Sequence, residues 1–201
     1  PGPEENIKGK PFVGRAGQML DKVLQSANFD PEKDVYITNS VFRMPPGTDG
    51  KAFRKPSDPE IDYYRPFVFE IMRLIDPLVV LLTGNVASQS VLRKTGITSL
   101  RGKWTQMDRS WVMPIFHPSY LLRNPDRSPG SPKALMWEDI REVRRKFDEL
   151  IAQAKAEKAA ISVHVGWILA VLLGVALWLF SGWVMALSGI QRELLEGFIT
   201  L

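Results

Sequence analysis

The sequence predicts an α/β fold, a three-layer αβα sandwich with a short central parallel sheet, followed by one C-terminal transmembrane helix. Short apolar runs that suit strands alternate with amphipathic segments that suit helices, which is typical of a parallel sheet covered by helices on both faces. The run at 78–83 (LVVLLT) is apolar throughout, as in a strand buried on both sides. Residues 159–191 contain no Asp, Glu, Lys or Arg, which predicts a membrane span.

Composition excludes several classes of protein. Charged residues make up 24% of the 201 residues and hydrophobic residues 45%, which excludes a wholly disordered or collagen-like chain. The absence of cysteine excludes a disulfide scaffold, a thiol nucleophile and a metal site held by thiolates of this sequence. Only His117 and His164 are histidines, so a histidine-rich metal site is excluded as well.

The predicted elements follow from local patterns. A Gly/Pro-rich loop is expected as far as Gly14, and apolar residues at helical spacing predict a helix over 15–27. Since no strand precedes Pro1 and no initiator Met is present, the sequence looks like a fragment from which the first strand of the sheet is missing. The remaining predictions are a strand at 34–38, a Pro/Gly/Lys loop at 44–59, a helix over 59–75, a strand at 78–83, a helix over 84–93, a strand at 111–116 and a charged helix over 131–158.

Two polar residues are expected at one edge of the predicted sheet. Asn39 ends the first predicted strand, and His117 ends the last. In parallel sheets ligands bind beyond the carboxyl ends of the strands. The order of elements therefore predicts a site at this edge, although it does not specify the chemistry.

The C-terminal part is predicted to be a charged helical linker (151–160), a transmembrane helix (161–190) and a short tail (191–201). A bilayer core of about 30 Å needs roughly 20 apolar residues in a helix. Six Lys or Arg residues lie between 141 and 158 and one follows the span, which predicts an N-terminal domain on the cytoplasmic side. If the tail is an artefact of a frame or gene fusion, the domain is simply cytoplasmic.

Small residues repeat every four positions in the predicted span. Gly166, Ala170 and Gly174 lie on one face, where a partner helix could pack closely. Ordinary membrane-helix composition explains the same pattern, and both interpretations stay open.

Six motifs follow one another along residues 1–123. They are PG at 1–2 with Glu5, GKPFVGRAGQ at 9–18, YITN at 36–39, PPG at 45–47, LRGKW at 100–104 and HPSYLLR at 117–123. In this order and spacing, residues 1–150 resemble the uracil-DNA glycosylases of the bacterial and archaeal family 4. The resemblance implies an N-terminally truncated glycosylase domain that acts on uracil-containing DNA by base flipping.

The resemblance also implies roles for individual residues. His117 and Asn39 are the expected catalytic residues: His117 stabilises the leaving uracil anion, and Asn39 also reads the uracil edge. Phe12 stacks on the flipped base. Gly2 and Glu5 belong to the substrate-binding loop, where Glu5 is expected to brace the chain. The residues expected to contact DNA are Pro118, Ser119, Leu121, Leu122, Arg123, Arg101 and Lys103, with Leu121 or Leu122 as the wedge. For each residue an ordinary packing or capping role is the alternative.

Two departures from the family pattern stand out. The family places a water-positioning acid just before the first proline, upstream of this sequence, so this segment taken as complete should have weak or no activity. The family also holds an iron–sulfur cluster with four cysteines, two of which would fall near Arg43 and Tyr64. We therefore expect no cluster, no metal and no other cofactor, with Tyr63, Tyr64 and Phe53 packing the neighbouring loop.

Two functions remain open from the sequence. The first is a hydrolase, a uracil-DNA glycosylase that initiates base-excision repair. The alternative is a catalytically decayed glycosylase fold that serves as the cytoplasmic head of a membrane-complex subunit. Retention of Phe12, Asn39 and His117 favours the enzyme, whereas the missing cysteines and the membrane span favour decay.

Overall fold

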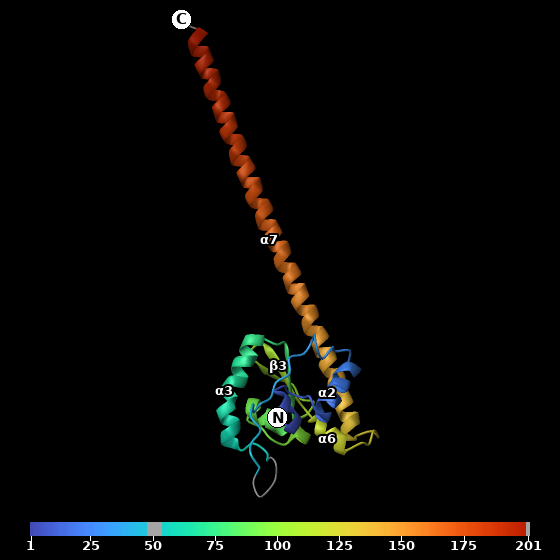
Figure 1. Cartoon of the computed structure of the whole chain (residues 1–201). Coiled ribbons are helices and arrows are strands. Elements are labelled where there is room, and N and C mark those ends of the chain that lie inside the picture. Colours follow the sequence, from blue (N-terminus) through green and yellow to red (C-terminus); the bar gives the residue numbers. More distant parts are fainter. Residues whose placement is uncertain (48–53, 200–201) are drawn as a thin grey trace. The chain divides into compact units, whose positions relative to one another are not determined.

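The structure, a computed structural model, describes residues 1–47 and 54–199, with side chains as far as Trp183. The chain forms two compact units, Pro1–Leu150 and Ile151–Leu201. The helices are α1 (Pro3–Lys8), α2 (Arg15–Ser26), α3 (Asp58–Ile75), α4 (Gly84–Leu92), α5 (Ile97–Leu100), α6 (Pro118–Arg123) and α7 (Pro132–Ile199), and the strands are β1 (Val79–Thr83), β2 (Thr105–Met107) and β3 (Ser110–Ile115) (Figure 1).

The described sheet has three strands in the order β1-β3-β2. Strands β1 and β3 are parallel, in a register that runs from Val79 opposite Trp111 to Thr83 opposite Ile115. Strand β2 pairs antiparallel with β3. Because β1 and β3 run in the same direction, the segments that follow them emerge at one edge of the sheet, as the sequence predicted.

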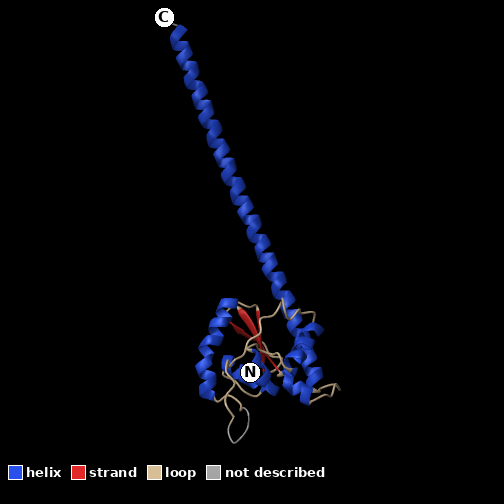
Figure 2. Ribbon diagram, in the orientation of Figure 1, coloured by secondary structure: helices blue, strands red, loops and turns tan. Residues whose placement is uncertain are grey.

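Helices cover both faces of the sheet (Figure 2). On one face, Met113 and Ile115 pack into a core with Leu24 of α2, Leu121 of α6 and Ile140 of α7. On the other face, a smaller core forms around residues of α3, α4 and the strands, namely Val68, Val91, Leu82 and Val112. Alternate residues of β3 thus enter opposite cores, as the side-chain period of a strand requires. The mixed α/β architecture of the N-terminal unit matches the prediction.

Several predicted elements are corrected. Residues 34–38 were expected to form a strand, but they belong to no described sheet ladder. Val35 and Ile37 of this segment pack against the core that α2, α6 and α7 form on one face of the sheet, so hydrophobic packing and not strand pairing holds the segment. Helix α1 replaces part of the loop expected before Gly14, because Pro3 is suited to a first helical turn and the Glu5 carboxylate accepts from the Gly2 N–H at the start of the helix. The short antiparallel strand β2 was not predicted.

The motif at 100–104 forms hydrogen bonds that hold the sheet against α7. The Arg101 guanidinium donates to the Asp139 carboxylate at 2.8 Å and to the Leu135 carbonyl at 2.8 Å. Gly102 has a φ of +72°, and a Cβ there would lie 2.7 Å from the Asp139 carboxylate, so glycine lets the buried acid approach the loop. The Trp104 indole N–H donates to Glu142 at 3.1 Å. These contacts hold α7 against the sheet edge.

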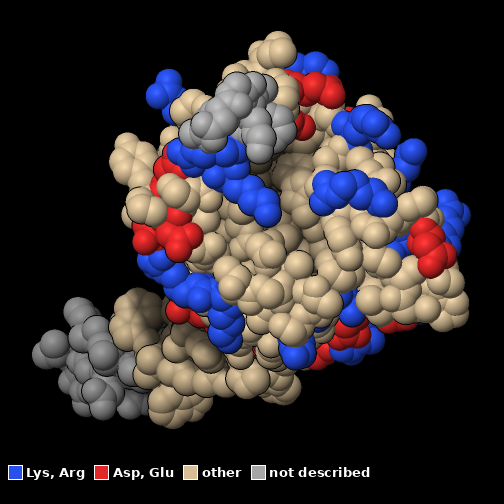
Figure 3. All heavy atoms as spheres, turned by 90° about the horizontal axis from the view of Figure 1, so that it is seen from below, with Lys and Arg blue, Asp and Glu red and all other residues tan. Residues whose placement is uncertain are grey.

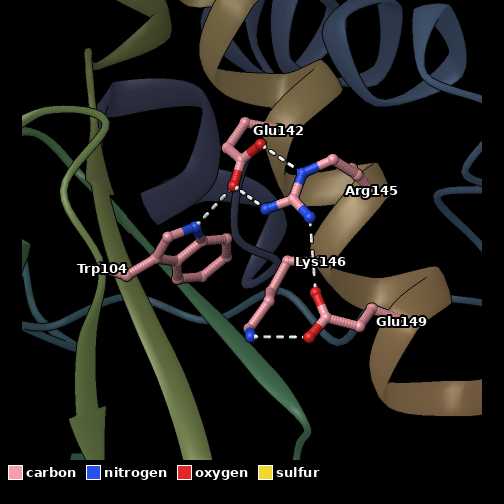
Figure 4. A network of polar contacts seen from close by, with 5 residues as sticks. All are labelled: Trp104, Glu142, Arg145, Lys146 and Glu149. Carbon is pink, nitrogen blue, oxygen red and sulfur yellow. Dashed lines mark hydrogen bonds and ion pairs between the residues drawn. The ribbon is translucent and has the colours of Figure 1, made fainter. Parts of the chain in front are cut away.

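The polar contacts continue along α7 from Glu142 (Figure 4). Arg145 pairs with Glu142 and also with Glu149, which in turn accepts from Lys146. The Lys146 ammonium lies 4.2 Å from the centre of the Trp111 ring, so one end of this network packs on β3. The network extends the attachment of α7 by two further helical turns.

The C-terminal unit is helical. Among the described residues, one helix contains a stretch that is long and apolar enough to cross a membrane, judged by length and composition. The apolar side chains of this stretch are exposed; Trp178 is 74% accessible and Trp167 is 71% accessible. Gly166 and Gly174 have open space where a Cβ would be added.

Candidate active site

The carboxyl ends of β1 and β3 meet at two residues. Gly84 follows β1 directly, and His117 lies two residues beyond β3. A Cβ added to Gly84 would lie 3.0 Å from the His117 Cβ, and Gly84 has a φ of +84°. Only glycine suits this position, because both the close approach and the left-handed backbone disfavour a side chain. The strand ends therefore bring His117 to the predicted edge of the sheet.

Phe12 lies beside His117. The two ring centroids are 5.8 Å apart, and the ring planes are inclined by 30°. Phe12 has a φ of +52°, a left-handed conformation that is rare for an aromatic residue and that marks a constrained backbone. Its carbonyl oxygen occupies the space that a Cβ of Gly17 in α2 would fill, only 1.6 Å away. Helix α2 thus fixes the backbone that presents the Phe12 ring.

His117 is held in one tautomer. Its Nδ1 accepts a hydrogen bond from the Ser119 backbone N–H at 3.1 Å, and the Ser119 hydroxyl lies 2.8 Å from the same atom. Because a backbone N–H can only donate, Nδ1 carries no proton, and the neutral ring bears its proton on Nε2. Burial, and secondarily the positive charge of Arg123, lower the pKa of His117 below its ordinary value. The site therefore presents a neutral imidazole with an Nε2–H donor.

Glu5 joins two parts of the N-terminal loop. Its carboxylate accepts from the Gly2 N–H at 3.0 Å and from the Gly14 N–H at 2.9 Å. Partial burial opposes ionisation of Glu5, but the hydrogen bonds from the backbone outweigh it, and the pKa of Glu5 is lowered. An ionised Glu5 thus bridges the segment that carries Phe12 to the start of α1.

Asn39 makes no hydrogen bond to Phe12 or His117. Its side chain is half-buried and has no hydrogen-bond partner in the described part of the chain. Along the segment that leads to it, Val35 and Ile37 pack against the same core as Phe12, whereas Tyr36 is 61% exposed. This alternation is that of an extended segment. Asn39 lies at the same two-residue spacing as Val35 and Ile37, so we expect its side chain on the side that faces the core.

The residues of α6 divide into buried and exposed sets. Pro118 is fully buried and Leu121 is 1% exposed within the core, so the expected DNA contacts of these two side chains are wrong. The physical reason is the helical period, which turns Leu121 toward α2 and α7. Leu122 is half-buried and Arg123 is exposed. Of the two leucines, Leu122 is therefore the one able to reach a ligand.

The two cations of the LRGKW motif also differ. Arg101 is committed to Asp139 and its guanidinium is largely covered, so the expectation that it contacts DNA is corrected. Lys103 is exposed and has no ion-pair partner among the described residues. Of these two cations, Lys103 is therefore the one whose side chain is accessible to a ligand.

The face at which β1 and β3 end carries a hollow bordered by Lys and Arg side chains (Figure 3). Helix α6, which follows β3, lies at this lower end of the N-terminal unit in Figure 1. Acidic side chains lie mainly toward the margins of the face in this view. A hollow with a basic border suits a polyanionic ligand.

The residues present do not fit the iron–sulfur cluster of family 4. Arg43 and Tyr64, the positions expected for two of its ligands, line one pocket of about 560 Å³, but neither offers a thiolate. Among the described residues no group of three or more His, Cys, Asp or Glu could hold a metal. Tyr64 instead packs edge-on against Phe42 at 5.4 Å and against Tyr63 at 5.0 Å, while Phe53 lies outside the described residues.

Three residues that shape the site were not identified from the sequence in that role. Gly17 and Gly84 accommodate Phe12 and His117, and Ser119 fixes the His117 tautomer. A glycine directly after a buried strand, or inside an amphipathic helix, is the signal that could have identified the first two. Ser119 was expected to contact DNA, and its hydrogen bond depends on a local turn that residue type alone does not reveal.

Comparison with known proteins shows the family of the chain. The sequence model of the uracil DNA glycosylase superfamily matches residues 1–141. A type-4 uracil-DNA glycosylase of Thermotoga maritima is 36% identical over 149 residues, which are 72% of this chain and 72% of that protein. The type-4 enzyme of Archaeoglobus fulgidus is 33% identical over 135 residues, which are 62% of this chain and 64% of that protein. A DNA polymerase of Bacillus phage SP01 is 31% identical over 121 residues, 60% of this chain but 13% of the polymerase. The chain belongs to the uracil-DNA glycosylase superfamily.

Proposed function

We propose that this chain is a uracil-DNA glycosylase, a hydrolase that cleaves the N-glycosidic bond of uracil in DNA and so initiates base-excision repair. The observation that carries the proposal is the pairing of the Phe12 ring with a neutral His117 at the carboxyl edge of the sheet. The type-4 enzymes to which the chain is similar support the same substrate.

His117 acts on the leaving group. When the bond between the sugar C1′ and the uracil nitrogen breaks, negative charge develops on the base; a water molecule adds its oxygen to C1′, and the proton that it releases neutralises the departing uracil anion. A neutral imidazole stabilises that charge by donating a hydrogen bond from Nε2–H to a uracil oxygen. A donor placed where charge develops contributes on the order of 10²–10³ to the rate. The Ser119 backbone N–H donates a hydrogen bond to Nδ1, and this bond keeps the ring proton on Nε2.

Phe12 and Asn39 select the base. An extruded base has lost its stacking partners, and the Phe12 ring replaces one of them. The Asn39 amide offers one acceptor and two donors, which can match the donor and acceptor of the uracil edge. A half-buried amide without a hydrogen-bond partner in the described part of the chain favours a base that completes its hydrogen bonds over one that cannot.

Accessible residues of α6 and of the LRGKW motif bind the DNA: Arg123 and Lys103 are exposed, and Leu122 is half-buried. Leu122 enters the base stack left by the extruded nucleotide, in the manner of other apolar wedges. Arg123 and Lys103 bind phosphates, which gives a salt-dependent affinity without sequence preference. Glu5 positions the loop of Phe12 through Gly2 and Gly14 and does not act on the reacting bond.

The test is uracil release by the full chain, purified in detergent. A duplex and a single-stranded oligonucleotide, each with one uracil, are incubated with the wild type and with His117→Ala and His164→Ala. These are the only histidines of the sequence, so His164→Ala is a matched control. We expect alkali-labile sites with the wild type and the control, formed slowly because this sequence lacks the acid that is expected to position the water, and reduced at least about 100-fold by His117→Ala. A folded wild type that produces no such sites would favour the decayed membrane-complex subunit.

We also propose that residues 161–190 anchor the enzyme in a membrane, with residues 1–150 on the cytoplasmic side. The length and apolar composition of the stretch and the exposure of its side chains support the proposal. The face with Gly166, Ala170 and Gly174 is the place where a partner helix would pack. Carbonate extraction of membranes tests the anchor, because release of the protein into the soluble fraction would contradict it.

A further inference from the structure

A groove of about 660 Å³ lies on the N-terminal unit, apart from the Phe12 and His117 site. One wall is α2, which contributes Met19 and Val23, and the other is the beginning of α7. Leu121 of α6 and Met136 of α7, each 1% exposed, form the floor. Helices α2 and α6 and the beginning of α7 lie side by side in Figure 1. Its volume is within the range of small-ligand sites.

Trp137 is the large aromatic residue of the groove. It is 44% exposed, and its ring has no aromatic or cationic partner among the described residues. Lys133 and Arg141 lie one helical turn before and after it, so all three belong to one face of α7. The ring is thus available to a ligand and is flanked by positive charge.

Four cations and one acid line the groove. Lys22, Arg127, Lys133 and Arg141 have no ion-pair partner in the described part of the chain, and Glu138 is the acidic residue. This charge favours an anion. The apolar walls and the exposed indole favour a ligand with a flat ring. A nucleotide combines both, since each base has a π-face and each phosphate a negative charge.

We propose that this groove binds a nucleotide of single-stranded DNA, with its base stacked on Trp137 and its phosphates on the surrounding cations. The inference rests on the proposed function, because that function brings DNA to the adjoining α6. Leu121 links the two regions: it forms part of the groove floor, and the next residues of α6, Leu122 and Arg123, face the DNA in the proposed reaction. The enzyme would therefore hold a strand that flanks the extruded uracil.

The proposal is tested by binding, without turnover. The full chain in detergent is titrated with a fluorescent, uracil-free dT12 oligonucleotide, and anisotropy gives the dissociation constant at several salt concentrations. Stacking on one aromatic residue predicts that Trp137→Ala weakens binding at least about fivefold, and that Trp137→Phe weakens it less. Lys133→Ala should lower the salt dependence as well as the affinity. Phe67→Ala, which removes an aromatic residue of α3 that is 53% exposed, and Lys94→Ala, which removes an exposed cation, are the matched controls.

Equal affinities of the wild type, Trp137→Ala and Lys133→Ala for dT12 would overturn the proposal. The proposal would also be overturned if polyglutamate displaced dT12 equally well from the wild type and from Trp137→Ala, because that result would identify a groove for acidic peptides. If the wild type fails to release uracil yet binds dT12 through Trp137, the groove stands and the proposed function falls. If the wild type releases uracil but Trp137→Ala does not change dT12 binding, the proposed function stands and the groove falls.

Discussion

Gly17 determines where Phe12 can lie, so Gly17→Ala should disturb both stability and catalysis. The added Cβ would be 1.6 Å from the Phe12 carbonyl oxygen and 2.3 Å from its carbonyl carbon. At an unobstructed helical position, glycine to alanine stabilises by about 0.5–1 kcal/mol. Overpacking costs about 1–3 kcal/mol, and a collision with backbone belongs to the upper part of that range. The expected net loss is about 1–2 kcal/mol.

This loss corresponds to a decrease in the melting temperature of about 2–8 °C for a chain of this size. The Phe12 carbonyl must move, and the Phe12 ring moves with it. Because a displacement of about 1 Å near a reacting group can cost on the order of 100-fold, kcat/KM for uracil release should fall about 10- to 100-fold. Thermal unfolding and single-uracil kinetics of the full chain in detergent measure the two effects.

Gln18→Ala is the control for this prediction, because Gln18 is the exposed neighbour of Gly17 on α2. Its stability should change by no more than about 0.5 kcal/mol, with normal uracil release. If Gly17→Ala is as stable as the wild type and releases uracil at the same rate, the contact between α2 and the Phe12 loop does not position the ring, and the reasoning fails.

Three further predictions concern single residues. Arg101→Ala leaves the Asp139 carboxylate buried without its partner, and we expect a loss of about 3 kcal/mol in denaturant unfolding; an unchanged midpoint would refute the attachment of α7. Burial, and secondarily Arg123, lower the pKa of His117 from 6.5, so its contribution to stability is complete above pH 6.5 and is lost as the pH falls toward the lower folded-state pKa. The free energies of unfolding of the wild type and His117→Ala, measured from pH 8 to pH 5, should therefore approach each other as the pH falls. A constant difference between them would exclude this titration. Ser119→Ala keeps the backbone N–H but loses the hydroxyl, so kcat should fall several-fold and the acid limb of the pH profile should shift, whereas an altered KM alone would indicate a role in binding.

The parts of the fold that local patterns determine were predicted from the sequence. The apolar run at 79–83 is typical of a strand buried on both faces, and the amphipathic period at 15–26 is typical of a helix buried on one face. Both elements, β1 and α2, formed as expected. The predicted strand at 34–38 did not join the sheet, because pairing depends on where the fold places the segment and not on its composition. Strand β2 was missed because three residues carry no measurable period and pair only through the turn at Asp108, which has a φ of +49°.

The site was predicted in outline and corrected in detail. His117 was placed correctly at the strand end, because parallel pairing alone brings it there. Sequence similarity could not separate residues that face a ligand from residues that hold the site together, since both recur in the same motifs. Arg101 and Leu121 belong to the second group, and only their burial reveals it. The left-handed backbone of Phe12 has no signal in residue type at all.

The central claim is that one uracil contacts Phe12, Asn39 and His117 at once, and a crystal structure with free uracil bound tests it most directly. We expect a uracil ring stacked on Phe12, its amide edge hydrogen-bonded to Asn39 and one of its oxygens within hydrogen-bond distance of His117 Nε2. Uracil bound elsewhere, or a bound uracil that Asn39 and His117 do not contact, would contradict the proposed roles of these residues.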